Sequence, residues 1–177
     1  MTRKLLAVAA AVIAWIGVSG HATAQEFTAT GRFDFNTVGD AADIGNSRTL
    51  FAGAFEGTYV PGATDLGPLQ FATIICPSYF VPGFMAGGYC IVVDDDGDRV
   101  FLSFDCNRAI PATADAVVAC EGDTRWIGGT GKFLGVAGGG TIRATITAFN
   151  PDGTARGYVI RNEAYVVTDC GAGCVRP

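Results

Sequence analysis

Hydrophobic and polar residues alternate along several stretches of the chain, and this pattern predicts β-strands. The clearest case is residues 26–35, where one face carries Phe27, Ala29, Gly31, Phe33 and Phe35. The opposite face carries only polar or charged side chains. A period of two with one apolar face is typical of a strand that is buried on one side.

The remainder of the chain continues as short β-rich runs separated by turn residues. Predicted strands occupy residues 49–60, 69–76, 88–94, 99–105, 116–121, 124–128, 141–149 and 154–168. Predicted loops occupy residues 36–47, 61–68 and 128–140, which are rich in Gly, Asp, Asn or Pro. The pattern amounts to about eight strands, without a helix-period segment, a second domain or a repeat. It predicts a single all-β domain, either a sandwich or a barrel.

The first residues do not follow this pattern and resemble a leader. Arg3 and Lys4 precede an apolar run over residues 5–18, and Ala22-Thr23-Ala24 has the small-x-small form of a cleavage site. This order predicts a secretory signal peptide over residues 1–24 and a barrel domain over residues 25–177. A membrane anchor is the alternative, but the run is shorter than the ~18–20 residues needed to span a bilayer. We therefore expect a periplasmic or secreted protein that is soluble after cleavage.

Composition narrows the class of protein. The chain is 49% hydrophobic and only 16% charged, with 25 glycines in 177 residues. These proportions exclude intrinsic disorder, and the glycines lack the three-residue period of collagen. The formal net charge of −5 becomes more negative once Arg3 and Lys4 are removed with the leader. An acidic domain argues against nucleic acid and anionic membranes as partners.

The one histidine of the chain, His21, lies within the predicted leader. The cleaved protein would therefore lack Ser-His-Asp and Cys-His catalysis, a histidine general base and histidine-containing zinc sites.

Six cysteines follow the leader: Cys76, Cys90, Cys106, Cys120, Cys170 and Cys174. An even number in an exported chain predicts disulfides, although six cysteines allow 15 connectivities and the sequence does not choose among them. The spacing favours pairs 76–90, 106–120 and 170–174. A redox role is less favoured because three residues, not two, separate Cys170 from Cys174. A four-cysteine zinc site would need a second short pair.

Two segments together resemble a known family. They are Gly88-Tyr-Cys-Ile-Val-Val-Asp-Asp-Asp-Gly-Asp-Arg-Val-Phe101 and Gly128-Gly-Thr-Gly-Lys-Phe-Leu-Gly-Val-Ala-Gly-Gly-Gly-Thr141. The pair resembles bacterial exported members of the allene oxide cyclase barrel-like family, which is related to plant allene oxide cyclases and dirigent proteins. The resemblance implies an eight-stranded antiparallel β-barrel with an apolar interior and no bound metal or cofactor.

Both segments also allow other interpretations. The glycines suit bulges and corners of a bent strand, whereas a phosphate-binding loop would require Gly and Ser or Thr where Trp126 and Phe133 stand. The acidic run around Gly97 invites a calcium site, but an EF-hand loop would need acids at Val92 and Ser103. We therefore expect a barrel corner and a solvated hairpin turn, without a metal site.

Three functions compete: an exported barrel that binds a small apolar ligand in its interior, a cofactor-free cyclase, isomerase or stereocontrolling dirigent-like protein, and a structural protein with a packed barrel. In the last strand, one face carries Asn162 among apolar residues, and we expect this amide to bind a ligand or to be a satisfied core amide. A cavity of several hundred Å³ would support the first two functions, and catalytic residues are not apparent. The candidate ligand-binding residues are Phe33, Phe35, Phe51, Phe55, Ile142, Ile146, Tyr158 and Asn162.

Overall fold

The structure, a computed structural model, describes residues 24–168 except 66, 84, 112 and 115. The predicted signal peptide and the predicted Cys170–Cys174 pair therefore fall almost wholly outside the described residues. Within them, no helix is long and apolar enough to cross a membrane.

The described residues form ten strands in one sheet and one short 3-10 helix, η1. The elements are β1 (Gln25–Ala29), β2 (Arg32–Asp43), β3 (Thr49–Val60), β4 (Ala72–Val81), β5 (Met85–Asp94), β6 (Arg99–Cys106), β7 (Arg108–Ile110), β8 (Val118–Gly129), η1 (Gly131–Phe133), β9 (Ala137–Phe149) and β10 (Ala155–Val167).

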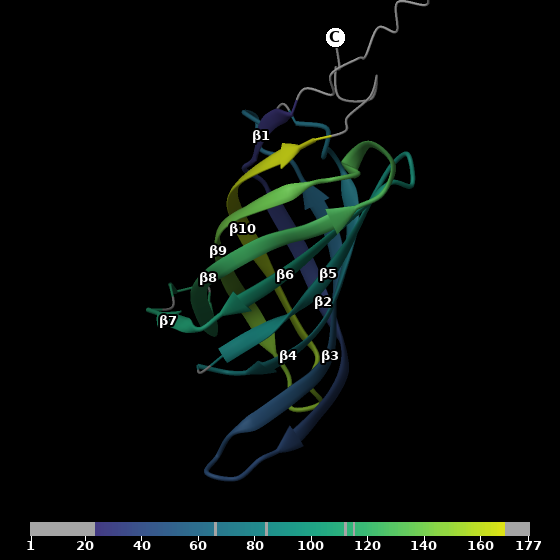
Figure 1. The fold of residues 1–177 in the computed structure, drawn as a ribbon. Coiled ribbons are helices and arrows are strands. Elements are labelled where there is room, and N and C mark those ends of the chain that lie inside the picture. The colour runs from purple at the N-terminus through teal and green to yellow at the C-terminus, as the bar shows by residue number, and fades with distance from the viewer. Residues whose placement is uncertain (1–23, 66, 84, 112, 115, 169–177) are drawn as a thin grey trace, which may run out of the picture.

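The sheet closes on itself. Antiparallel pairing runs from β2 through β3, β4, β5, β6, β8, β9 and β10, and β10 then pairs with β2 (Figure 1). β1 pairs with the last residues of β10, and the short β7 pairs with β8. The predicted eight-stranded antiparallel barrel is thus confirmed.

One predicted loop is instead an extension of two strands. β2 continues to Asp43 and pairs with β3 back to Thr49, so this hairpin extends past its neighbouring strands at the bottom of Figure 1. The composition of residues 36–47 is typical of a loop, but pairing with β3 provides partners for its backbone groups.

The strand predicted over residues 69–76 does not end before Pro77. β4 continues to Val81, and Pro77 lies opposite Ala54 of β3. On the other side, the pairing with β5 is interrupted between Ile75 and Ser78. Proline lacks an N–H, so it fits where the ladder is already interrupted.

The predicted loop over residues 128–140 is partly strand: β8 continues to Gly129, and the last four residues belong to β9. β9 begins at Ala137, and a Cβ atom at Gly138 or Gly140 would lie 2.3 Å from the carbonyl oxygen of Ala164 or Asn162, respectively. Glycine here lets β9 approach β10 closely, in agreement with a role in shape.

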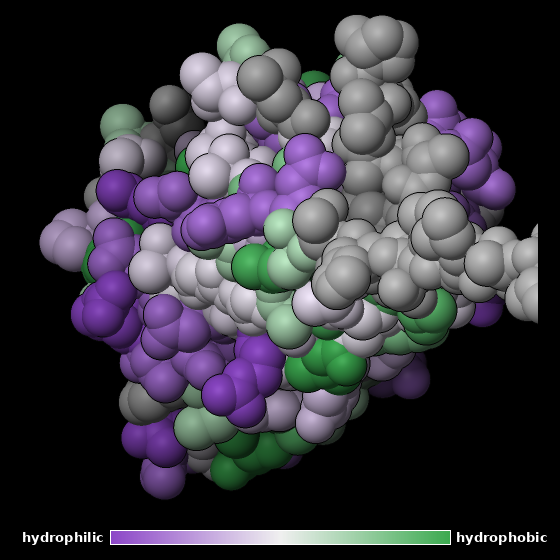
Figure 2. All heavy atoms as spheres, turned by 45° about the horizontal axis from the view of Figure 1, so that its top comes forward, coloured by the Kyte–Doolittle hydropathy of each residue, from purple (hydrophilic) through white to green (hydrophobic). Residues whose placement is uncertain are grey.

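Alternate residues of the strands point into the barrel and form its core. The fully buried side chains include Phe51, Tyr59, Tyr165 and Val167. The disulfides Cys76–Cys90 and Cys106–Cys120 are present, as the spacing favoured. On the face drawn in Figure 2, hydrophobic residues form small patches between hydrophilic ones. The apolar interior is therefore the candidate location of a binding site.

Candidate functional site

The interior of the barrel contains a cavity with almost entirely apolar walls. About 70 Å³ is open to the centres of water-sized molecules, and the walls come from β2–β6 and β8–β10. This cavity is smaller than the several hundred Å³ that would support the binding and enzyme functions over a packed structural barrel. One water molecule occupies about 10–15 Å³ of such volume. The cavity therefore has space for about five water-sized groups, which corresponds to one small ring.

The cavity contains many of the predicted residues. Those in its wall are Phe33, Phe35, Phe55, Ile142 and Ile146. Phe51 packs against Phe55 with 6.0 Å between ring centroids, but it lies outside the wall. Whether any of these side chains binds a ligand stays a prediction.

The prediction for the last strand named the wrong face. Asn162 is exposed, and Tyr158 lies outside the barrel with the Arg32 guanidinium 4.0 Å from its ring centroid. The inward side chains of β10 are Val159, Arg161, Glu163, Tyr165 and Val167. Hydrophobicity alone would place charged residues outside the barrel, whereas Arg161 and Glu163 are buried as an ion pair.

Glu163 is the centre of a buried polar network. Its Oε1 accepts hydrogen bonds from the Arg161 Nε at 3.0 Å and the Thr124 hydroxyl at 2.6 Å. Its Oε2 accepts from the Arg161 Nη2 at 2.5 Å and the Trp126 indole N–H at 2.6 Å. Four donors therefore occupy both carboxylate oxygens, which offsets the cost of burying this charge.

The loop between β3 and β4 adds a second carboxylate beside this network. The Tyr59 hydroxyl donates to Asp65 at 2.7 Å, and the Gly67 backbone N–H donates to the other oxygen at 3.2 Å. The Arg161 guanidinium lies 5.2 Å from the Tyr59 ring centroid. Burial raises the pKa of Tyr59, and the hydrogen bond to Asp65 raises it further. Both carboxylates therefore belong to the same end of the barrel as Arg161.

Arg161 connects the polar network to the cavity. It is 4% exposed, and together with Thr124 it forms the polar part of the cavity wall. Burial lowers the pKa of the guanidinium, but the charge and hydrogen bonds of Glu163, with Tyr59 and Asp65, outweigh this and raise the pKa overall. Arg161 is therefore a cation in the interior.

One nitrogen of this cation lacks a hydrogen-bond partner in the part of the chain that the structure describes. The Arg161 Nη1 is buried and has no hydrogen-bond acceptor among the described residues. An unsatisfied buried donor costs about 1–3 kcal/mol, and more when it is charged. This nitrogen has almost no accessible surface, so the surface that the cavity offers to a ligand is apolar.

Sequence reasoning missed the polar network, although a signal exists. Arg161 and Glu163 are opposite charges two residues apart, so they share one face of a strand. Thr124 and Trp126 have the same spacing on β8. A charge pair on one strand face identifies two residues that can be buried together.

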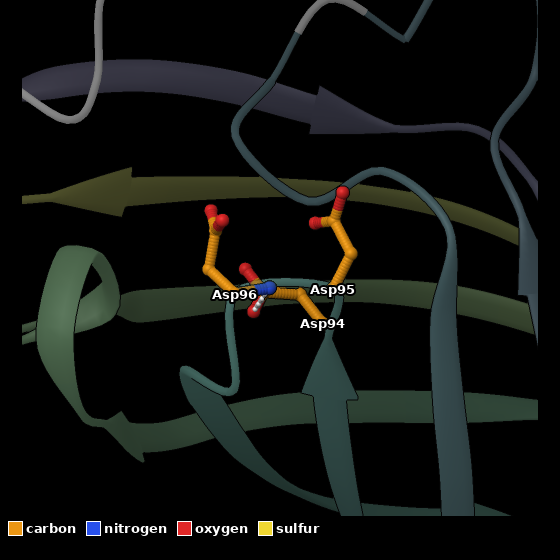
Figure 3. A group of neighbouring side chains, drawn as sticks. All are labelled: Asp94, Asp95 and Asp96. Atoms are coloured by element: carbon orange, nitrogen blue, oxygen red, sulfur yellow. Dashed lines mark hydrogen bonds between the residues drawn. The ribbon is translucent and has the colours of Figure 1, made fainter.

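The acidic turn after β5 is held by a lysine. Figure 3 shows Asp94, Asp95 and Asp96 at the end of β5, with the Asp96 backbone N–H donating to the Asp94 carboxylate at 3.0 Å. The Lys132 ammonium lies 2.5 Å from Asp94 and 2.6 Å from Asp96. The Lys132 backbone N–H also donates to Asp98 at 3.0 Å. These contacts tie the hairpin turn to the glycine-rich segment, as a structural role requires.

Comparisons with known proteins complete the description. No protein-family profile and no curated protein match the chain. A solved structure of a pterocarpan synthase dirigent protein is similar in fold, with 14% sequence identity over 80% of this chain and 85% of that chain and a TM-score of 0.43.

Proposed function

We propose that the protein binds a small apolar molecule inside the barrel. The observation that carries this proposal is the cavity of about 70 Å³, whose walls are apolar apart from Arg161 and Thr124. Concave apolar sites with a few placed polar groups are typical of small-molecule binding. A fully packed structural barrel would not need such a space.

Binding is favoured over catalysis by the state of Glu163. Four hydrogen-bond donors occupy its two oxygens, and Arg161 supplies two of them. A general base needs an oxygen that can reach the proton of the substrate. Glu163 therefore serves better to orient Arg161 than to take a proton.

We also propose that the protein is exported, with residues 1–24 as its signal peptide. The disulfides Cys76–Cys90 and Cys106–Cys120 support an oxidising compartment. N-terminal sequencing of the protein from the periplasm or the medium should start at Gln25. A chain that keeps Met1 would contradict this proposal.

The binding proposal is tested with toluene as the probe, followed by NMR of the methyl groups of Ile142 and Ile146, both in the cavity wall. We expect saturable shifts in the unmutated protein. Ala144→Phe fills the cavity and should abolish them, whereas Ala52→Phe on the exposed side of β3 should not. Native mass spectrometry of the purified protein is a second test, because a tightly held ligand would be retained. Folded protein that binds no toluene and carries no ligand would refute the proposal.

A further inference from the structure

We propose that a neutral saccharide chain of glucose-type pyranose units binds in a groove on the outer face of the barrel. The groove has a volume of about 650 Å³ and crosses β4, β5, β6 and β8. Small-molecule sites commonly have volumes of about 300–1,000 Å³. The groove shares only Phe104 and Thr124 with the wall of the interior cavity. This inference is therefore independent of the binding function proposed for the interior.

Two tyrosines form one side of the groove, and both expose their side chains to solvent. Tyr79 is 46% exposed and Tyr89 is 64% exposed. Tyr79 pairs with Gly87, and Tyr89 lies two residues further along β5 on the same face of the sheet. Residues in this diagonal relation are about 7–8 Å apart. Two neighbouring exposed aromatic rings offer a platform on which the apolar faces of ligand rings can pack.

Glycines form the floor of the groove beside the tyrosines. Gly87 and Gly88 are consecutive residues of β5, and both line the groove. A Cβ atom at Gly87 would lie 2.9 Å from the Tyr79 hydroxyl oxygen and 3.2 Å from its Cζ. The end of the Tyr79 ring therefore lies over Gly87, close to the backbone of the sheet. Glycine in a strand suits a site where another molecule approaches the backbone closely.

The other side of the groove carries charged side chains that do not pair within the fold. Asp105 of β6 and Asp123 and Arg125 of β8 are exposed and line the groove. In the part of the chain that the structure describes, none of their side chains makes a hydrogen bond or an ion pair. Ser103 pairs with Arg125, and two residues from this pair each strand carries an aspartate. Like charges on neighbouring strands do not stabilise a sheet, so these side chains are available to a ligand.

Together these features favour a neutral sugar over a charged or a purely apolar ligand. A pyranose with equatorial hydroxyls has an apolar C–H face that can pack on Tyr79 or Tyr89. Its hydroxyls can donate to the carboxylates and accept from the Arg125 guanidinium. Asp105 and Asp123 would repel an anion, whereas Arg125 would repel a cation. Because the groove is open on the surface, a chain of several sugar units can enter it and continue beyond it.

The first test is an NMR titration with cellotetraose, followed through the backbone amides of Gly87 and Gly88. We expect saturable shifts in the unmutated protein. Tyr79→Ala and Tyr89→Ala should each weaken cellotetraose binding about tenfold, since each removes a ring that packs on the sugar. Phe71→Ala is the matched control, because Phe71 is 61% exposed but lies outside the groove, and its Kd should be unchanged. Circular dichroism checks that each variant is folded.

The second test concerns the charged side of the groove. The double variant Asp105→Asn with Asp123→Asn should weaken cellotetraose binding about tenfold, since hydrogen bonds to charged acceptors are stronger than those to neutral ones. Asp40→Asn on the exposed part of β2 is the control and should have no effect. Tetragalacturonate, an anionic sugar chain, should bind the unmutated protein more weakly than cellotetraose. The double variant should narrow this difference, because it removes the repelling carboxylates.

Four results would overturn the inference. They are the absence of saturable shifts with cellotetraose, an equal loss of affinity in Phe71→Ala, tightest binding of tetragalacturonate, and self-association of the protein that Tyr89→Ala abolishes in sedimentation equilibrium. The last result would make the groove an interface between copies of the chain. Toluene binding in the interior is measured separately, so a failure of either proposal is distinguishable from a failure of the other.

Discussion

The two ends of the barrel interior differ in chemistry although the same strands build both. Along β10, the inward side chain of Val159 lines the cavity, whereas Arg161, Glu163 and Tyr165 fill the other end. Along β3, Phe55 lines the cavity and Tyr59 bonds to Asp65. The comparison shows that a hydrogen-bonded polar network fills one end of the interior, so the cavity is confined to the apolar end.

The largest expected effect is at the centre of the polar end. Glu163→Leu removes four hydrogen bonds and leaves the Arg161 cation buried without its partner, so we expect a loss of about 3–5 kcal/mol in the free energy of unfolding. Urea unfolding measures this loss. Glu121→Ala, which breaks the exposed pair with Arg108, is the control and should cost at most about 1 kcal/mol. Equal losses of unfolding free energy for the two substitutions would show that the buried network does not stabilise the polar end of the barrel.

The apolar end depends on its disulfides. Each bridge closes a sequence separation of 14 and lies in the cavity wall. We expect Cys76→Ser with Cys90→Ser to lower the free energy of unfolding by about 3 kcal/mol and to weaken the binding of toluene. The same pair of substitutions at Cys106 and Cys120 is the parallel test. Unchanged toluene affinity in both double variants would mean that the bridges do not shape the cavity.

A smaller effect is expected outside both ends, at Lys132. Lys132→Met leaves the buried carboxylate of Asp94 without its cation, at a cost of about 1–3 kcal/mol. Hydrogen exchange should become faster in residues 94–99 and 128–136, while toluene affinity is retained. A loss of toluene binding would contradict the separation of this turn from the cavity.

Ionisation of the buried tyrosines has the smallest effect on the free energy of unfolding near neutral pH, and this effect increases as the solution becomes alkaline. Burial raises the pKa of Tyr59 and Tyr165 above the ordinary value of 10.0. The unfolded chain therefore loses these protons first, and the stability that is present below pH 10 is lost progressively as the pH rises further. Tyrosinate absorbance and circular dichroism should follow this loss together. Tyr59→Phe should shift the alkaline transition to higher pH, and an unchanged transition would count against a role for this phenol.

Much of the fold was predictable from local pattern. Alternation at residues 26–35 and 49–60 identified β-structure whose inward side chains include Phe33, Phe35 and Phe55, although the structure divides residues 26–35 between β1 and β2. The cysteine spacing favoured the two pairs that the structure contains. These features depend on neighbours in the chain or across one hairpin, so they leave a trace in the sequence.

The site was less predictable, because alternation shows which side chains share a face and not which face is inside. For β10, hydrophobicity favoured the face with Ile160 and Asn162, yet the opposite face is buried. That choice depends on donors from β8, Thr124 and Trp126, which satisfy Glu163 only after the barrel has closed. The sequence by itself determined a Gly-punctuated chain of strands with disulfides. Only the tertiary structure decided that a charge pair lies inside, because the hydrogen-bond donors that offset the cost of its burial come from a strand far away in the sequence.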